Sequence, residues 1–232
     1  YIHKIMAGKT IDDPVLLANF LISEKVLAGD NCFFLQDIPD GIHNFNFNGT
    51  DNNFIAFKPY DTIKMLGDIS VGGAFQKFEN IEIDYEGWEK RDTDNSGPTP
   101  EDMPYTKSFD LLGEGCEMNR CIVHDIPEFG FWRTTKTSKI NECLIFNNGW
   151  QQNGEKGHGH GIYTQNIEGI KTIENCIIFF NYGWGIKIQG TTICSGYHIK
   201  NCILFDPSLP TNGLGGMNQS IVVGGFEQYS NI

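Results

Sequence analysis

Side chains that could bind or transform a ligand gather in the second half of the chain. His158 and His160 lie two positions apart, so both face the same side of an extended strand. Tyr163 follows them, and Lys187 occupies the equivalent position in a second copy of the same sequence pattern. A histidine or tyrosine can take a proton and a cation can stabilise a carboxylate, as β-elimination requires. The pattern predicts His160 or Tyr163 as the base and Lys187 or Arg133 as the cation.

Polar and aromatic residues are expected to surround this group. If Ile162 faces inward, strand alternation places Tyr163 outward, in a column with Asp110, Trp132 and Lys187 at about 4.8 Å per strand. A sugar chain could lie along such a column, with aromatic rings on sugar faces and amides on hydroxyls. The alternatives are an ordinary solvated sheet face and a structural role for the histidines. The ligand-binding residues that we expect are Asp110, Trp132, His158, Gln165, Trp184 and Gln189.

The elements that position these residues come from an internal repeat. The segment 141–146 reads NECLIF and is followed by a Gly/Trp turn and the strand-like GIYTQ. The segment 174–179 reads ENCIIF and is followed by a similar turn and GIKIQ. Related segments give equivalent positions at Ile81, Cys121, Cys143, Cys176 and Cys202. A repeat on this scale decides the fold and must be recognised first.

Each repeat consists of short β-branched runs joined by Gly/Asn turns, without a helical period. This pattern predicts an all-β parallel solenoid in which each equivalent residue, and the residue two positions later, faces the interior. One solenoid accounts for residues 1–232 as a single domain. Asn80, Asn175 and Asn201 share one position of the repeat, and we expect a structural role for their amides.

Extra residues occur at one place in the repeat. The distance from the equivalent position to the next Gly-Ile-like strand is 9 residues in two repeats, 18 in two others and 28 in a fifth. The longest excess contains 88–107, which we expect to be a loop because it is charged and rich in proline. Insertions gathered at one edge of a repeat protein are typical of its binding face.

The first residues differ from the repeats. Asp12, Asp13 and Pro14 form a helix start, and 14–25 has an amphipathic pattern. We expect an N-terminal cap over 1–27 whose helix covers the open end of the solenoid. The chain begins without Met and ends in what resembles a further coil, which favours a fragment of a longer protein.

Composition excludes several classes of protein. The net charge of −12 makes nucleic acid a poor partner, and no apolar run is long enough for a membrane span. Seven cysteines cannot all pair. Four of them share one repeat position, which favours stacked buried thiols over disulfides, and no Cys-x-x-Cys pair or third ligand for the histidines suggests a metal site.

The chain resembles the right-handed parallel β-helix proteins of the pectate-lyase-like superfamily. Residues 29–30, 40–43, 48–50 and 55–59 look like the opening coil of chondroitinase-B-like members, and 159–166 and 220–225 look like an uncharacterised bacterial subgroup. The resemblance implies this fold, and it covers lyases, hydrolases, tailspikes and adhesins. For a lyase it implies calcium, although the carboxylates that hold calcium in those enzymes have no matching positions here.

Two functional hypotheses follow. The first is an extracellular protein that binds a polysaccharide and could act as a lyase on a uronate-containing glycan. A two-carboxylate hydrolase is disfavoured because the outward column offers one carboxylate, Asp110. The second hypothesis is a non-catalytic fibre, tailspike or adhesin segment at a cell or virion surface. Such a homo-oligomer would need an outer apolar stripe, for which the sequence offers Leu144, Phe146, Ile177, Phe179 and Ile203.

Overall fold

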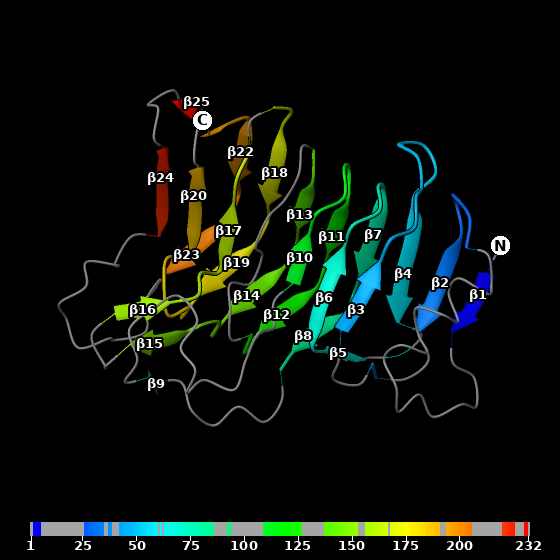
Figure 1. Cartoon of the computed structure of the whole chain (residues 1–232), viewed down its shortest axis with the longest axis horizontal. Helices are drawn as coiled ribbons and strands as arrows, with labels where there is room; N and C mark the ends of the chain where they lie inside the picture. The colour runs from blue at the N-terminus through cyan, green and yellow to red at the C-terminus, as the bar shows by residue number, and fades with distance from the viewer. Residues whose placement is uncertain are drawn as a thin grey trace.

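A computed structural model of the protein describes residues 2–5, 26–34, 37–38, 42–59, 61, 63–85, 92–93, 109–126, 137–152, 156–166, 168–190, 194–205, 220–225 and 230–231. Every regular element within these ranges is a β-strand, and most strand pairs are parallel (Figure 1). The predicted helix at 14–25 and most of the predicted loop at 88–107 lie outside these residues. Nowhere in these ranges does a helix have the length and hydropathy needed to cross a membrane.

Two long parallel sheets run through the molecule. Sheet A contains, in spatial order, β1 (Ile2–Ile5), β2 (Asn31–Phe34), β4 (Ile55–Pro59), β7 (Gln76–Glu79), β11 (Glu117–Asn119), β13 (Lys139–Asn141), β18 (Lys171–Glu174) and β22 (Tyr197–Lys200). Sheet B contains β5 (Lys64–Leu66), β8 (Glu82–Asp84), β12 (Ile122–His124), β14 (Leu144–Phe146), β19 (Ile177–Phe179) and β23 (Ile203–Phe205).

Shorter sheets complete the arrangement. Sheet C contains β3 (Ile42–Phe45), β6 (Asp68–Val71) and β10 (Phe109–Leu111), and sheet D contains β17 (Ile162–Thr164), β20 (Ile186–Gly190) and β24 (Ile221–Gly225). Sheet E joins β9 (Asp92–Thr93) to the antiparallel pair β15 (Trp150–Gln152) and β16 (Lys156–His158). A further parallel pair joins β21 (Cys194–Ser195) and β25 (Ser230–Asn231).

The chain visits the sheets in a repeating order. It passes from sheet A to sheet B to sheet D as β18, β19 and β20, and again as β22, β23 and β24. Because successive passages are hydrogen-bonded in parallel, equivalent residues of the repeat become neighbours. The register pairs Val123 with Ile145, Ile145 with Ile178, and Ile178 with Leu204.

From β7 onward, the passage from sheet A to sheet B uses two residues each time. The first of them has a positive φ in five passages: 58° at Asn80, 52° at Arg120, 54° at Glu142, 56° at Asn175 and 53° at Asn201. Side-chain amides stack here, since Asn175 Nδ2 donates to Asn141 Oδ1 at 2.8 Å and Asn201 Nδ2 donates to Asn175 Oδ1 at 3.3 Å. The predicted stacking of amides is confirmed for Asn175 and Asn201, whereas Asn80 Oδ1 accepts from Arg120 Nε at 2.9 Å.

The interior contains the residues that alternation predicts. Cys121, Cys143 and Cys176 are buried free thiols, and Cys202 is partly buried at the end of the same column. The neighbouring Cys143 thiol, together with burial, raises the pKa of Cys176 to about 12. Aromatic rings fill the other end of the interior, where the centroids of Phe45, Phe57 and Phe78 lie 5.0 Å apart along the cluster. The core therefore runs continuously along the direction in which strands stack.

Candidate functional site

The outward face of sheet D carries the central residues of the predicted column. Tyr163 pairs with Lys187, and Lys187 pairs with Val222, while Ile162 and Ile186 are buried on the opposite face. Asp110 lies in sheet C, where its register partner is Ser70. Trp132 and Arg133 lie outside the described residues. The structure thus brings Tyr163 and Lys187 together, and the described pairs do not join Asp110 to them.

Lys187, Tyr163 and Trp184 form a compact group that we call the sheet D cluster. The Lys187 Nζ atom lies 4.9 Å from the centroid of the Tyr163 ring and 4.8 Å from that of Trp184. Contacts of this kind are attractive because the ring faces carry partial negative charge. Gln165 Nε2 donates to the Tyr163 hydroxyl at 3.0 Å, and Gln189 is exposed further along the sheet. These side chains present aromatic, cationic and amide groups on one face.

His160 lies underneath this cluster and is buried, with an exposed fraction of 4%. Its ring stacks on Trp184 with centroids 4.9 Å apart, and its Nδ1 accepts a hydrogen bond from the Trp184 backbone N–H at 3.0 Å. Burial, together with the charge of Lys187, holds the pKa of His160 well below its usual range. A neutral ring that accepts at Nδ1 carries its proton at Nε2. This geometry favours a positioning role for His160 over that of a base.

The close packing around His160 depends on a glycine. A Cβ atom added at Gly183 would lie 2.3 Å from His160 Nδ1, which no side chain tolerates without movement. The Gly183 N–H also donates to the Gly159 carbonyl at 2.6 Å. Glycine at position 183 therefore lets the turn before β20 approach the histidine, and this approach sets the position of Trp184.

Two of the insertions meet beside sheet D. The antiparallel strands β15 and β16 come from the insertion after Cys143, and β9 comes from the insertion after Ile81. The register pairs Gln151 with Asp92 in parallel. Trp150 is buried and stacks on His158, with ring centroids 4.1 Å apart. The two insertions thus form a small sheet of their own, and His158 contributes to its packing.

A buried pair of asparagines, which the sequence argument missed, fixes the turn between sheets B and D. Asn148 Nδ2 donates to Asn181 Oδ1 at 3.0 Å, and both side chains are completely buried. Asn148 Oδ1 also accepts from the Ile126 N–H at 3.1 Å, and the Tyr182 N–H donates to the Asn148 carbonyl at 2.9 Å. The signal was available, because both asparagines shortly precede a Gly-Trp dipeptide.

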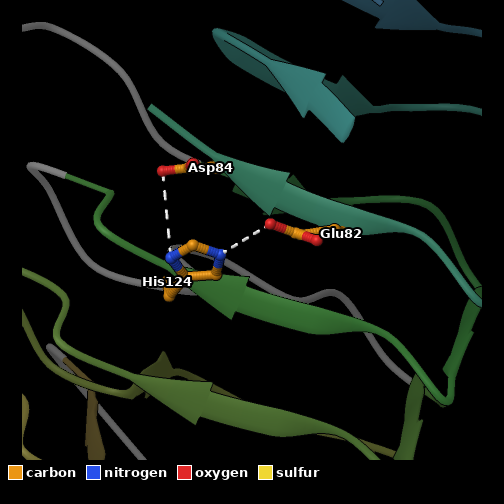
Figure 2. A group of neighbouring side chains, drawn as sticks. All are labelled: Glu82, Asp84 and His124. Atoms are coloured by element: carbon orange, nitrogen blue, oxygen red, sulfur yellow. Dashed lines mark hydrogen bonds and ion pairs between the residues drawn. The ribbon is translucent and has the colours of Figure 1, made fainter. Parts of the chain in front are cut away.

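A second polar cluster lies on sheet B, where Glu82, Asp84 and His124 approach one another (Figure 2). His124 Nε2 lies 3.1 Å from Glu82 Oε1, and His124 Nδ1 lies 2.6 Å from Asp125 Oδ2 and 3.8 Å from Asp84 Oδ1. Lys64 Nζ contacts Glu82 at 3.2 Å and Asp84 at 3.1 Å. We call these five residues the ionic cluster.

His124 is protonated in this arrangement. Both ring nitrogens face carboxylates, and an ionised carboxylate only accepts hydrogen bonds, so both nitrogens must donate. Burial lowers the pKa of His124, but the hydrogen bonds that its ring donates to Asp125 and Glu82 outweigh this effect, and the net pKa is raised.

The ionic cluster does not fit the calcium ion that the resemblance implies. Calcium takes six to eight oxygen ligands. Here two carboxylates hold the Lys64 ammonium, and the imidazolium of His124 fills the space between Glu82 and Asp125. Two fixed positive charges already pair with the three carboxylates, so the cluster is best described as a network of ion pairs.

Comparison with known proteins adds no family to this description. No protein-family model matches the chain, and a search of curated proteins finds no significant match.

Proposed function

We propose that this chain is a right-handed parallel β-helix, of the kind found in the pectate-lyase-like superfamily, that binds an extracellular uronate-containing polysaccharide along sheet D. The fold part of the proposal is supported by the repeated order of sheets, their parallel pairing and the matching register of equivalent residues. Interior stacking of like residues is what such a fold requires. The proposal places the protein outside the cell, or on a cell or virion surface.

The observation that carries the binding proposal is the sheet D cluster. Tyr163 and Trp184 are half-buried, and each holds the Lys187 ammonium within 5 Å of its ring centroid. Aromatic side chains offer rigid apolar surface for a sugar ring, and an ammonium attracts the carboxylate of a uronate. One cation placed between two rings therefore suits an acidic sugar better than a neutral one.

The insertions support the same location. Sheet E is built from two of them, and its strand β16 leads within a few residues into β17 of sheet D. The sequence Gly159–Gly161 joins the two strands, and the backbone of Gly159 contacts Gly183 beside the cluster. A wall joined to the sheet at this point would confine a ligand that lies along the column.

Cleavage of the bound polysaccharide is a second candidate function, favoured by the pairing of Tyr163 with Lys187. In β-elimination a base removes the proton from C5, the C4–O bond breaks, and a C4–C5 double bond forms while the departing oxygen takes up a proton. Tyr163 would act at the C5 proton and Lys187 at the carboxylate. The hydrogen bond that Gln165 Nε2 donates to the Tyr163 hydroxyl would hold that oxygen in position.

The binding proposal is tested with three variants. Tyr163→Phe and Lys187→Ala should each weaken binding to a uronate polysaccharide by about tenfold or more, because a hydrogen bond to a charged group is worth about 1.5–3 kcal/mol. Lys187→Arg keeps the charge and serves as the matched control. All three should melt like the wild type, since these positions face outward. Calorimetric titration against uronate and neutral polysaccharides measures the effect. If Tyr163→Phe and Lys187→Ala both bind the uronate polysaccharide as tightly as the wild type, that result would falsify the proposal.

The same proteins separate the remaining functions. A lyase releases unsaturated products that absorb in the ultraviolet, whereas a hydrolase releases reducing ends without that absorbance. A fibre or adhesin segment gives neither signal and no saccharide effect from Lys187→Ala. The apolar outer face of sheet B favours this last alternative, and loss of assembly by polar variants of Leu144 or Phe146 would support it.

A further inference from the structure

The outer face of sheet B carries two columns of apolar side chains. Register aligns one aliphatic and one aromatic residue from each passage, and rings of successive passages stack nearly in parallel. The centroids of His124 and Phe146 lie 4.9 Å apart, those of Phe146 and Phe179 5.1 Å, and those of Phe179 and Phe205 4.8 Å. We call the following residues the apolar face: Ile122, Leu144, Phe146, Ile177, Phe179, Phe180, Ile203 and Phe205.

Much of this face is exposed. The exposed fraction is 58% for Ile203, 41% for Phe205, 39% for Phe180 and 38% for Ile177. Scattered single hydrophobic residues are normal on a surface, but a contiguous apolar patch marks a site of interaction. The four residues are contiguous: Ile177 pairs with Ile203, Phe205 lies two positions after Ile203 on β23, and Phe180 packs edge-on against Phe205.

The backbone conformation of Phe180 gives independent evidence that this face is functional. The residue that follows the strand has a positive φ after β12 (Asp125, 53°), β14 (Asn147, 56°) and β19 (Phe180, 50°). Aspartate and asparagine adopt this conformation readily, whereas a bulky aromatic residue is strained in it. The strain places an aromatic ring on the surface, where burial within one chain does not compensate for it. Strain of this kind persists where function requires the side chain.

The distribution of charge indicates what covers the face. On the sheet B strands from β12 to β23, His124 is the one ionisable residue among the outward positions that the structure describes. The ionic cluster occupies one end of the face and contains both signs, with Lys64 and His124 among three carboxylates. A surface of this kind is complementary to itself when two copies align in the same direction. Opposed copies would place the charges against exposed Ile203 and Phe205, which is costly.

We propose that the apolar face binds a second copy of this chain, with the two copies parallel. The net charge of −12 opposes self-association over most of the surface. The apolar face avoids this repulsion, and the ionic clusters of the two copies can exchange partners at one end. The stacked columns of both copies have the same strand spacing, so each passage of one copy meets the equivalent passage of the other.

The first experiment measures oligomer size by analytical ultracentrifugation over a range of concentrations. Phe180→Asn takes the residue that the repeat uses at position 147, so it should preserve or raise the melting temperature and weaken self-association roughly tenfold or more. Ile170→Asn is the matched control, because Ile170 is 48% exposed and precedes a sheet A strand. A wild-type chain that stays monomeric up to its solubility limit overturns the proposal, as does unchanged association of Phe180→Asn.

The second experiment tests the direction of alignment. Under mild oxidation, Phe205→Cys alone should form a covalent dimer in the parallel arrangement, and the wild type serves as the control for Cys202. In the opposed arrangement, Phe205→Cys would instead cross-link to Ile122→Cys on mixing. That second result would overturn the parallel pairing. Neither measurement involves saccharide binding by sheet D. A negative result here would therefore exclude this interface without excluding the proposed function.

Discussion

Lys171 places an amine inside the protein. Its exposed fraction is 2%, and its Nζ donates to the Gln165 carbonyl and lies 3.5 Å from the Thr164 hydroxyl. Burial lowers the pKa of Lys171 to about 7. The ammonium is therefore disfavoured in the folded protein relative to the unfolded chain, where the pKa of lysine is about 10.4. Folding pays a penalty that is full below about pH 7 and disappears as pH approaches about 10.4.

Lys171→Met should therefore stabilise the protein at neutral pH. Replacing a buried charge with an apolar residue of similar volume stabilises by about 1–4 kcal/mol in favourable cases. Urea unfolding at several pH values should show the largest gain near neutrality and a smaller gain at alkaline pH. Lys200→Met, at an exposed lysine, should show no such trend. A variant that is less stable than the wild type at neutral pH would contradict the assignment.

His124 gives the opposite dependence on pH. Because its folded pKa is raised, its contribution is fully present below the unfolded value of about 6.5 and is lost as pH rises through the folded value. His124→Gln should cost about 1.5–3 kcal/mol at mildly acidic pH, since hydrogen bonds to charged groups have this worth. The stability difference between wild type and variant should shrink at alkaline pH. A difference that grows with pH would refute the protonated arrangement.

The sequence predicts which side of a strand a side chain faces better than it predicts which side chains touch. Alternation correctly placed Tyr163 and Lys187 outward and Ile162 inward, because a strand has a period of two. It did not predict that Trp184 would stack on buried His160. That contact depends on the close approach of Gly183 to His160. The approach is set by the conformation of the turn, which the alternation of residues along a strand does not predict.

The two-residue connection between sheets A and B imposes the same backbone on different side chains. Glu142 has a φ of 54°, a conformation that asparagine adopts more readily than glutamate. Its contact with Arg120 is 3.8 Å long and half exposed, so little is lost without it. Glu142→Asn should stabilise the protein by about 0.5–1 kcal/mol.

Thermal and urea unfolding check this expectation. Asn175→Ala provides the comparison, because it has the same backbone conformation but loses amide hydrogen bonds on both sides. It should destabilise by about 1–2 kcal/mol. If Glu142→Asn and Asn175→Ala changed stability in the same direction, the backbone conformation would not be the controlling factor.

Elements within the repeat were predictable, and elements within the insertions were not. The equivalent positions at Cys121, Cys143 and Cys176 align as the sequence predicted, because every repeat meets the same neighbours. The insertion over 88–107 was predicted as a loop, yet Asp92–Thr93 form a strand paired with β15. A two-residue strand is too short to show the alternation that identifies strands in a sequence, and its partner here lies far away along the chain.

For the molecule as a whole, each face has a different composition. The outer face of sheet A is bound by ion pairs, such as Lys58 with Glu79 at 2.8 Å and Lys77 with Glu117 at 3.3 Å. Sheet B is apolar beyond its ionic cluster, and sheet D is aromatic and cationic. A shared interior thus supports three separate surfaces, and a change on one should leave the others intact.

The stability cost of inserting one residue should depend on where in the repeat the residue is inserted. One glycine inserted after Asn175 would shift β19 by one position, which exchanges its inward and outward faces, and should cost more than about 2 kcal/mol. One glycine inserted between β15 and β16 lengthens an insertion of the repeat and should cost less than about 0.6 kcal/mol. Unfolding of the two variants in parallel measures both values. Equal costs would show that the connection between sheets A and B is not rigid.

The unequal tolerance of these connections affects how the protein can change over generations. Where β7 ends at Glu79 and β8 begins at Glu82, and at each later equivalent, the gene cannot gain or lose codons without breaking the stack. The connection that ends at sheet D already varies between passages, so mutations that change its length survive there. Heritable variation is thereby directed to the border of the sheet D cluster. Such a lineage can exchange one ligand for another while it inherits the same interior.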